Sequence, residues 1–361
     1  MNVTQSQRTG RGERDSNAKV ITLKELTRIL DLSPTTISLV LNRARGAKSI
    51  PKETKDRIFE AVRKYNYRPN FLARSLRVRR TFSVGVLVPE LSDGYSAQVL
   101  AGIEQRLLDA GYLCLVTTHH HRPELLEDRP LLLYERCVDG IIAVDTPVRG
   151  QPPTPVVSVS GHHRVPGVLN IELDHGQAAR LALEHLLRLG HREIAVIQGQ
   201  AFSSDTEVRW ESIQKTAAEL GVEIPPERVV QLEGDSPLPD TGYEAAKRLL
   251  ARGASFTALF SFNDISAFGA IRALREAGLR VPEDVSVVGF DDIWEASYHI
   301  PPLTTIRQPL EEMGRLAASM LLERIQGPRN GEDGGVVLVQ PELVVRASTA
   351  PAPDKGDAGR Q

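Results

Sequence analysis

The sequence has few cysteines, few aromatic residues and no long apolar stretch. Only two of its 361 residues are cysteine and 5% are aromatic. Cys114 and Cys137 are too few for a disulfide scaffold, and no signal peptide is recognisable, so a reducing cytoplasm is the expected location. No apolar run approaches about 18 residues, which excludes a transmembrane helix. With 41% hydrophobic and 25% charged residues, the composition predicts an ordinary globular protein with a sizeable core.

The chain as a whole has almost no net charge, although its N-terminal part and its remainder differ strongly in charge. The formal net charge is −2. Residues 1–80 contain 19 Lys and Arg against 7 Asp and Glu, whereas residues 81–361 contain 25 against 39, which gives blocks of +12 and −14. A basic block beside an acidic body predicts a polyanionic partner at one end of the chain. The alternative is a basic tail that only aids solubility.

The basic block has the pattern of three short helices. Residues 1–19 contain almost nothing that packs, so a disordered arm is expected there. Thr22 is the predicted cap of a helix over 23–30, Ser33 with Pro34 begins a second helix that runs to Asn42, and a third follows Pro51. The apolar positions predicted to face the interior are Leu23, Leu26, Ile29, Leu30, Ile37, Val40, Leu41, Ile58, Phe59 and Val62.

The pattern changes at Phe82. Strand-like runs then alternate with amphipathic helical stretches over roughly 265 residues, which predicts parallel sheets covered by helices and divided between two α/β halves. The strand-like runs are SVGVLVP, YLCLVTT, DGIIAV, PVVSVS, EIAVIQG, TALFSF and VSVVGF. Residues 350–361 are polar and rich in Pro and Gly, so we expect a disordered tail.

Two helices joined by a tight turn inside a basic block can present the start of the second helix to the major groove of DNA. Free N–H groups at that end favour phosphate, and small hydroxyl side chains suit both phosphates and base edges. The residues at that end are Ser33, Pro34, Thr35, Thr36, Ser38 and Leu39. The alternative is a plain helical hairpin with an exposed polar turn.

Longer motifs help to distinguish a DNA-binding headpiece from a plain helical hairpin. YNYRPN at 65–70 is followed by ARSLR at 73–77, and the body contains EHLLRLGHREIAVIQG, SFNDISAFGAIRALREAGLRVPEDVSVVGFDD and PPLTTIRQPLEEMG. Over residues 20–348 the chain resembles the LacI-type family of transcriptional regulators. The resemblance implies a helix-turn-helix headpiece (20–67), a hinge helix and linker (68–80), and an α/β core (81–349). That core would consist of two subdomains with parallel sheets, similar to periplasmic sugar-binding proteins.

The resemblance also implies how the headpiece and hinge meet DNA. Base edges would be read by Pro34, Thr35 and Leu39. Phosphates would be contacted by Ser33, Thr36, Ser38, Asn42, Tyr67 and Asn70. In the minor groove, Leu76 would be the apolar wedge, Ala73 would permit close approach and Arg77 would reach into the groove. The alternative for Leu76 is packing on the core. Pro34 lacks the side-chain donor common in relatives, and the longer loop after Asn42 leaves Arg43 and Arg45 unassigned.

In the core, ligands of such sheets bind beyond the carboxyl ends of the strands. The resemblance places the effector contacts at Asp93, Tyr95, Arg209, Phe262, Asn263, Asp291, Trp294 and Gln308. These types suit a sugar or sugar derivative, since hydroxyls both donate and accept, with Phe262 and Trp294 as stacking partners. Asp291 and Asn263 are alternatively helix caps. His162 stands near a strand end where relatives carry an acidic residue, so their specificity does not transfer.

No catalytic or cofactor motif occurs in the body, and three adjacent histidines, His119 to His121, point in different directions, so neither a metal nor a cofactor is expected. We expect instead a homodimeric DNA-binding repressor of a pseudo-palindromic operator, gated by a small molecule. The alternatives are a sugar-uptake binding protein, which the basic headpiece opposes, and an α/β enzyme such as a sugar kinase or hydrolase.

Overall fold

The computed structural model describes residues 21–42, 45–68, 75–76, 78–150, 153–235, 238–327 and 334–353. The chain forms two compact units, residues 1–81 and 82–361. The expected N-terminal arm and residues 354–361 of the expected tail lie outside the described residues. None of the described helices has both the length and the apolar character needed to cross a bilayer.

The N-terminal unit, called the headpiece below, begins with a helix-turn-helix. Its elements are α1 (Leu23–Leu30), α2 (Pro34–Leu41), the 3-10 turn η1 (Arg45–Ser49) and α3 (Lys52–Lys64). Thr22 caps α1 and exchanges hydrogen bonds with Glu25, while the Ser33 hydroxyl accepts the Thr36 amide at the start of α2. Asp31 adopts a left-handed conformation that turns the chain sharply between the two helices. Both predicted helix starts are therefore confirmed.

A small apolar cluster holds the three headpiece helices together. Leu26, Ile37 and Ile58, one from each helix, are fully buried within it. Ile29 and Phe59 were expected in the same interior but are 46% and 37% exposed. The expectation was wrong for these two residues because a three-helix cluster covers only a narrow stripe of each helix, and both residues lie at its margin.

The core unit contains two six-stranded sheets within the described residues. The first sheet is parallel throughout, in the order β11-β5-β4-β3-β1-β2, and the second, in the order β12-β10-β9-β8-β6-β7, is parallel except for the β10–β12 pair. The strands are β1 (Ser83–Val88), β2 (Leu113–Thr118), β3 (Gly140–Val144), β4 (Val156–Val159), β5 (Leu169–Leu173), β6 (Ile194–Gln198), β7 (Val229–Gln231), β8 (Ala258–Ser261), β9 (Ser286–Asp291), β10 (Thr304–Arg307), β11 (Val336–Val339) and β12 (Glu342–Val344).

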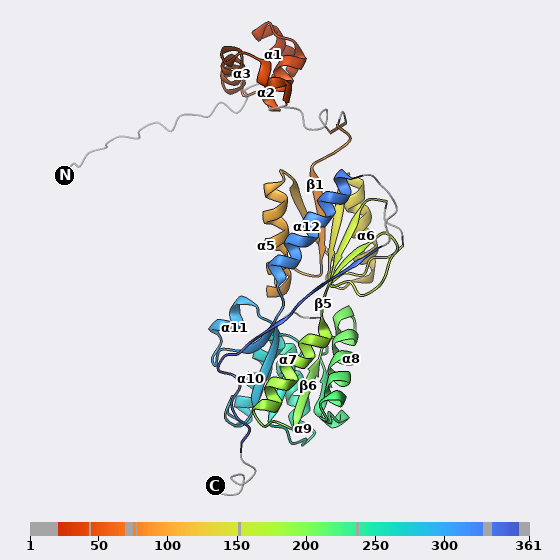
Figure 1. The fold of residues 1–361 in the computed structure, drawn as a ribbon, viewed down its shortest axis with the longest axis vertical. Helices are drawn as coiled ribbons and strands as arrows, with labels where there is room; N and C mark the ends of the chain where they lie inside the picture. Colours follow the sequence, from red (N-terminus) through yellow and green to blue (C-terminus); the bar gives the residue numbers. More distant parts are fainter. Residues whose placement is uncertain are drawn as a thin grey trace, which may run out of the picture. The chain divides into compact units, whose positions relative to one another are not determined.

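Helices cover both faces of each sheet, which confirms the predicted α/β class (Figure 1). The helices of the core are α5 (Gly94–Asp109), α6 (Pro123–Glu135), α7 (His175–Arg188), α8 (Ser204–Glu219), α9 (Asp240–Ala251), α10 (Asp264–Glu276), α11 (Trp294–Tyr298) and α12 (Leu310–Gln326), with a short 3-10 turn, η2 (Pro226–Arg228), before β7. The first sheet with α5, α6 and α12 is the first subdomain. The second sheet with α7 to α11 is the second subdomain.

The chain passes from one subdomain to the other after β5, after β10 and after β11 (Figure 1). These crossings lie side by side at the carboxyl ends of the strands, where the two subdomains meet. Ligands of parallel sheets bind at such ends, so the topology itself makes this region the first place to look for a site.

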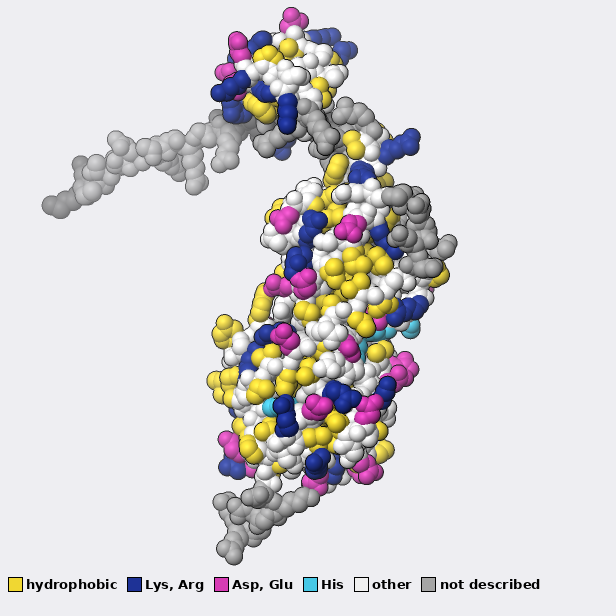
Figure 2. All heavy atoms as spheres, in the orientation of Figure 1, with side chains coloured by type: hydrophobic (Ala, Val, Ile, Leu, Met, Phe, Trp, Pro, Cys, Tyr) yellow, Lys and Arg dark blue, Asp and Glu magenta, His cyan; other side chains and the backbone are white. Residues whose placement is uncertain are grey.

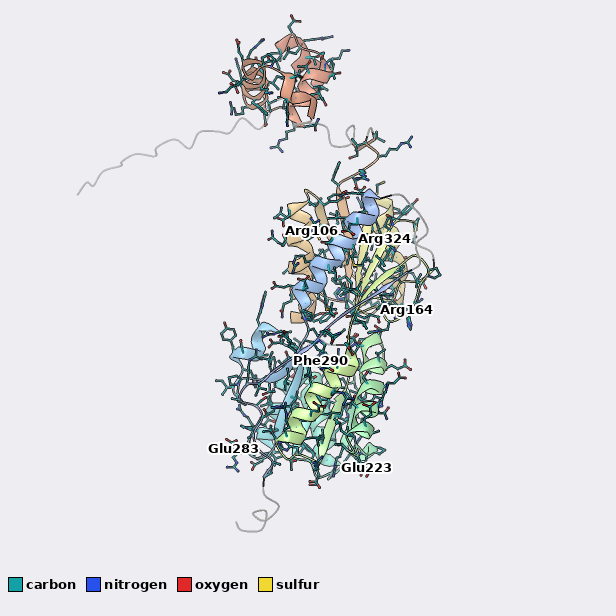
Figure 3. The ribbon with its side chains drawn as sticks, in the orientation of Figure 1. Arg106, Arg164, Glu223, Glu283, Phe290 and Arg324 are labelled. Atoms are coloured by element: carbon teal, nitrogen blue, oxygen red, sulfur yellow. The ribbon has the colours of Figure 1, made fainter. Side chains whose placement is uncertain are left out.

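In the first subdomain, α5 packs closely against α12. Gly102 and Gly314 permit that contact, because a Cβ atom on Gly102 would lie 1.9 Å from the carbonyl oxygen of Glu311, and one on Gly314 would lie 2.0 Å from that of Val99. Arg106, labelled in Figure 3, crosses the same contact and donates to the Ser319 hydroxyl at 2.9 Å.

The chain stays attached to the second subdomain beyond residue 349, where the sequence analysis placed the end of the core. The amide of Ala352 donates to the carbonyl of Leu189 at 2.8 Å, and the carbonyl of Ala350 lies 2.9 Å from Nε2 of buried His191. Residues 350–353 are therefore bonded to the core.

Candidate functional site

The exposed start of α2 is the first candidate surface. Pro34 at the first helical position fixes the backbone, and Ser33, Pro34 and Thr35 are solvent-exposed. The described surface of the headpiece is rich in Lys and Arg, whereas both signs are interspersed over the core (Figure 2). The start of α2 therefore exposes hydroxyl groups at the positive end of a helix, on a unit whose described surface is rich in Lys and Arg, and these features favour phosphate.

The other described residues that were predicted to contact DNA differ in how far they are exposed. Leu39 is half-buried, and a Cβ atom on Gly46 would approach its methyl groups to 3.4 Å. The Asn42 amide donates to the Ser38 carbonyl at 2.7 Å and so closes the end of α2. Tyr67 is buried in the headpiece cluster, and this burial raises its pKa. Packing therefore holds Tyr67 in place, and only the small exposed part of its side chain is available to contact DNA.

Leu76, the predicted minor-groove wedge, is among the described residues of the predicted hinge. Its side chain is 82% exposed. Asn70, Ala73 and Arg77 lie outside the described residues, as does Arg43.

The second candidate site is a pocket between the two subdomains of the core. Its walls come from the carboxyl ends of β1, β3, β6, β8 and β9, and it encloses about 880 Å³ of empty space, including its open mouth. Six of the residues predicted to contact an effector line it: Asp93, Tyr95, Arg209, Phe262, Asn263 and Asp291. The resemblance to LacI-type regulators therefore led to six of the residues that line this pocket.

Arg209 on α8 is the central cation of the pocket. Its side chain is only 4% exposed, and its guanidinium donates to Asp205 at 3.0 Å and to the carbonyl of Phe262. The guanidinium carbon also lies 4.3 Å from the ring centre of Phe262 and 3.7 Å from that of Phe290, the residue labelled in Figure 3. Its buried Nε atom has no hydrogen-bond partner within the described chain, so one donor remains for a ligand.

Asp291 ends β9 in a left-handed conformation with φ of 107°. Its carboxylate accepts a hydrogen bond from the Gln308 amide at 2.7 Å. Burial raises the pKa of Asp291 to about 7, despite opposition from Arg209 and Gln308. Gln308 is not among the residues that line the pocket, and its amide instead contacts Asp291.

Two predicted contacts also cap helices. The Asp93 carboxylate accepts from the Ser96 hydroxyl at 2.9 Å and from the Ser96 amide at the start of α5. Asn263 forms a capping box with Ser266 at the start of α10. The alternative considered for Asn263 is thus confirmed, while both caps still face the pocket. Burial raises the pKa of Asp93.

The three aromatic residues predicted to contact an effector lie in different environments. Tyr95 lines the pocket and its hydroxyl lies 2.7 Å from that of Ser160. Phe262 forms part of the wall beneath Arg209. Trp294 does not line the pocket and is 59% exposed at the start of α11. The stacking role predicted for Trp294 is wrong, because α11 begins three residues beyond the strand end and turns the indole outward to solvent.

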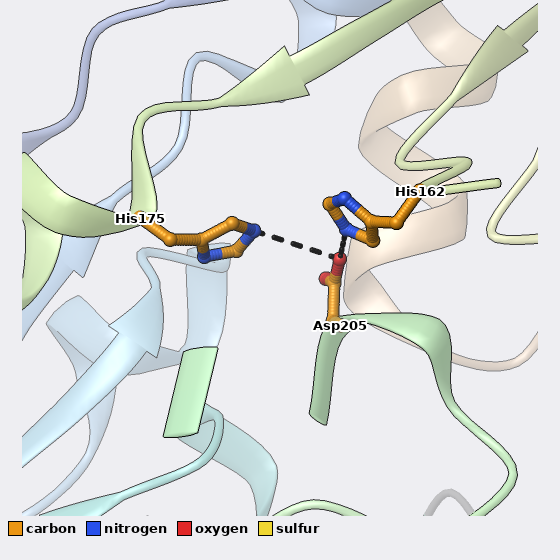
Figure 4. Close-up of side chains that lie close together, drawn as sticks. All are labelled: His162, His175 and Asp205. Carbon is orange, nitrogen blue, oxygen red and sulfur yellow. Dashed lines mark hydrogen bonds and ion pairs between the residues drawn. The ribbon is translucent and has the colours of Figure 1, made fainter. Parts of the chain in front are cut away.

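A buried polar network links the two subdomains beside the pocket (Figure 4). His162, which follows β4 of the first subdomain, places Nε2 2.5 Å from the carboxylate of Asp205 at the start of α8. His175 of α7 lies 3.7 Å from the same carboxylate. Burial would raise the pKa of Asp205, but the hydrogen bonds from both histidines and the charge of Arg209 hold it well below its usual value.

His162 and His175 titrate in opposite directions. Burial would lower the pKa of His162, but its hydrogen bond to Asp205 raises it overall. For His175, burial outweighs the same carboxylate and lowers the pKa. Of the two histidines, His162 therefore has the greater tendency to be protonated.

The same three side chains are the one group in the described chain whose spacing suits a metal ion, since their potential ligand atoms lie within 4.8 Å of one another. The guanidinium of Arg209 binds the other Asp205 oxygen, and His162 already hydrogen-bonds to Asp205 directly. A cation there would meet a positive charge across the carboxylate. We therefore interpret the group as an ion-pair network that positions Arg209.

Sequence reasoning missed Asp145, Asp205 and His121, which also line the pocket. Asp145 comes directly after the run DGIIAV, so the strand-end rule that found Asp93 could have found it as well. Among the three adjacent histidines, His119 is buried against Thr146. Burial lowers the pKa of His119 to about 4, whereas His121 reaches the pocket and stacks on Phe202 with ring centres 4.1 Å apart.

Comparison with known proteins decides the family. Residues 22–70 match the model of bacterial regulatory proteins of the lacI family, and residues 183–349 match a periplasmic binding protein-like domain. The HTH-type transcriptional repressor PurR of Haemophilus influenzae is 34% identical over 91% of this chain and 98% of its own length. The chain belongs to the lacI family. This LacI-family regulator is 31% identical to PurR of Pasteurella multocida over 91% of the chain and 98% of that relative.

Solved structures agree with this membership. The lac repressor dimer bound to operator and the anti-inducer ONPF has a TM-score of 0.80 and 28% identity, covering 92% of this chain and all of that one. The complex of the regulator CelR with cellobiose has a TM-score of 0.66 and 26% identity, covering 91% and 99% of the two chains. The LacI-family chain is thus a DNA-binding transcriptional regulator with a ligand-binding type of core, and the relatives are repressors rather than enzymes.

Proposed function

We propose that this regulator binds a pseudo-palindromic operator as a homodimer and represses transcription under the control of a carbohydrate effector in the pocket. One observation carries the proposal: a single core encloses, at the strand ends of both subdomains, a pocket whose polar walls are held across the gap by the His162–Asp205 bond. A ligand seated there contacts both subdomains at once, so its binding free energy depends on their relative angle.

Support for the DNA side comes from the start of α2 and from Leu76. The helix presents Ser33, Pro34 and Thr35 to solvent, and we assign Pro34, Thr35 and Leu39 to base edges. The phosphate contacts are Ser33, Thr36, Ser38, Asn42, Tyr67 and Asn70, with Ala73 and Arg77 beside Leu76 in the minor groove. The operator-bound lac repressor dimer supports the dimer, since one headpiece reads a half-site too short for genomic specificity.

Support for the effector class comes from the lining and from relatives. CelR was solved with cellobiose, and a LacI-family regulator of Enterococcus faecium, 28% identical with a TM-score of 0.64, was solved with ribose. In this chain Arg209, Asp93, Asn263 and Asp291 supply donors and acceptors beside aromatic walls, as hydroxyl groups require. Effector and operator then change each other's affinity by the same factor.

The DNA half of the proposal is tested by Leu76→Ala in the full chain. A site is first selected from random duplexes, and its affinity and bend are then measured with the wild-type chain. We expect Leu76→Ala to weaken binding at least about tenfold, or about 1.4 kcal/mol, and to reduce the bend, because the wedge between base steps is lost.

Leu131→Ala, which removes another leucine with 59% exposure on α6, is the matched control and should bind like the wild type. The salt dependence of binding should stay the same for both variants, because neither removes a charge. Equal affinity and equal bend for the two variants would refute the wedge.

A further inference from the structure

Carboxylates outnumber cations in the pocket. Six of its described lining residues are acidic, and Arg209 is the only Lys or Arg among them. The acidic residues are Glu90, Asp93, Asp145, Asp205, Asp235 and Asp291. Asp205 already neutralises Arg209 through the 3.0 Å ion pair. His121 adds little positive charge, because burial lowers its pKa. The other five carboxyl groups therefore have no further Lys or Arg among the described lining residues to balance them.

Most of these carboxylates already have partners in the protein. Asp93 accepts from Ser96, Asp291 from Gln308, and Glu90 from the Ser92 hydroxyl at 3.0 Å. Asp145 differs. Its backbone amide donates to Val159, but within the described chain nothing hydrogen-bonds to its carboxylate. Burial raises the pKa of Asp145 well above its usual value, and the charges of Asp205 and Asp93 raise it further.

Asp145 is held in this position by the backbone. It follows β3 with φ of 40°, a left-handed conformation that Asp tolerates better than most residues. A half-buried carboxyl group that lies near other carboxylates and lacks a donor is costly to ionise in the unliganded protein, and a positive charge on the ligand would favour its ionised form.

We propose that the effector is a hydroxylated molecule that carries a protonated amine, and that the amine binds against the Asp145 carboxylate. This inference rests on the proposed function, because it names the effector class of the same pocket. A charge-assisted hydrogen bond to an ionised carboxylate is about twice as strong as one between neutral groups. A neutral sugar leaves the crowded carboxylates without a counter-charge, and an acidic or phosphorylated sugar adds to their repulsion.

The proposal makes a first prediction that needs no ligand. In the full chain at pH 7 to 8, Asp145→Asn should raise the Tm, because it removes a carboxylate whose ionisation folding disfavours. A raised folded pKa means that stability is lost as pH increases, so the gain from Asp145→Asn should grow with pH. Asp128→Asn, an equal charge change at an exposed position of the same subdomain, should leave the Tm unchanged.

The second measurement uses hexosamines, their N-acetyl forms, the parent hexoses and the hexuronates as matched probes. Thermal shift identifies binders, and calorimetry measures their affinity for the wild type, Asp145→Asn and Asp128→Asn. We expect hexosamines to give the largest shifts, and Asp145→Asn to weaken their binding at least tenfold. Asp128→Asn should bind them like the wild type.

Each result of these measurements either supports or refutes the inference. A parent hexose or hexuronate that binds as tightly as its hexosamine, or a hexosamine whose affinity survives Asp145→Asn, overturns the inference and leaves the carbohydrate effector intact. If no member of the panel binds while the chain still binds its operator, the carbohydrate effector itself is wrong, and the inference fails with it.

Discussion

Replacing Asp205 by asparagine tests whether the buried network beside the pocket holds the core together. The amide keeps the shape of the side chain but removes the charge that Arg209, His162 and His175 face. Removing one partner of a buried ion pair typically costs about 3–5 kcal/mol, because the other charge stays buried without compensation. One kcal/mol changes the Tm of a large domain by about 2–4 °C, so we expect a fall of about 6–20 °C.

The size of this effect should depend on pH in a fixed direction. The depressed pKa of Asp205 means that its contribution is present above its usual pKa and is lost only in strong acid. His162 has a raised pKa, so its contribution is present below the ordinary histidine pKa of about 6.5 and is lost as pH increases through the folded pKa. The difference between wild type and Asp205→Asn should therefore be largest near pH 5.5 and should narrow toward pH 9.

The assay is thermal unfolding of the full chain, followed by calorimetry, at pH values between 5.5 and 9. Glu207→Gln is the matched control, since Glu207 lies in the same first turn of α8 but is exposed. Its loss should change stability by no more than about 0.3–1 kcal/mol, the value of a charge near a helix end. The reasoning is refuted if Asp205→Asn behaves like Glu207→Gln, or if its effect widens as pH increases.

Two further predictions concern packing in each unit. Gly102→Ala should destabilise the core by about 1–3 kcal/mol, because its methyl group would collide with the backbone of Glu311; denaturant unfolding measures this, and an unchanged midpoint would contradict the α5–α12 contact. Leu26→Ala should destabilise the headpiece by about 2–5 kcal/mol and abolish operator binding while thermal unfolding of the core stays the same. Ile29→Ala, at an exposed position of the same helix, is its control and should retain binding.

Local chemistry allowed the sequence to predict much of the headpiece. The starts of α1 and α2 follow from Thr22 and from Ser33 with Pro34, because capping depends on neighbours within four residues. In the core, the family resemblance together with the positions of the strand ends led to Asp93 and Asp291, and the resemblance alone led to Arg209 in α8. The interior of the headpiece was predicted less well, since periodicity marks a face of a helix but not how much of that face its neighbours cover.

What only the tertiary structure decided is how residues distant in the sequence meet. His162 and Asp205 come from different subdomains, and nothing in either segment predicts their contact at 2.5 Å. The exposure of Trp294 depends in the same way on the orientation of α11 after β9. The sequence alone determined the opposite charges of the two ends of the chain, because composition is local. The excess of carboxylates around a single arginine became visible only when the fold brought the strand ends of both sheets to one pocket.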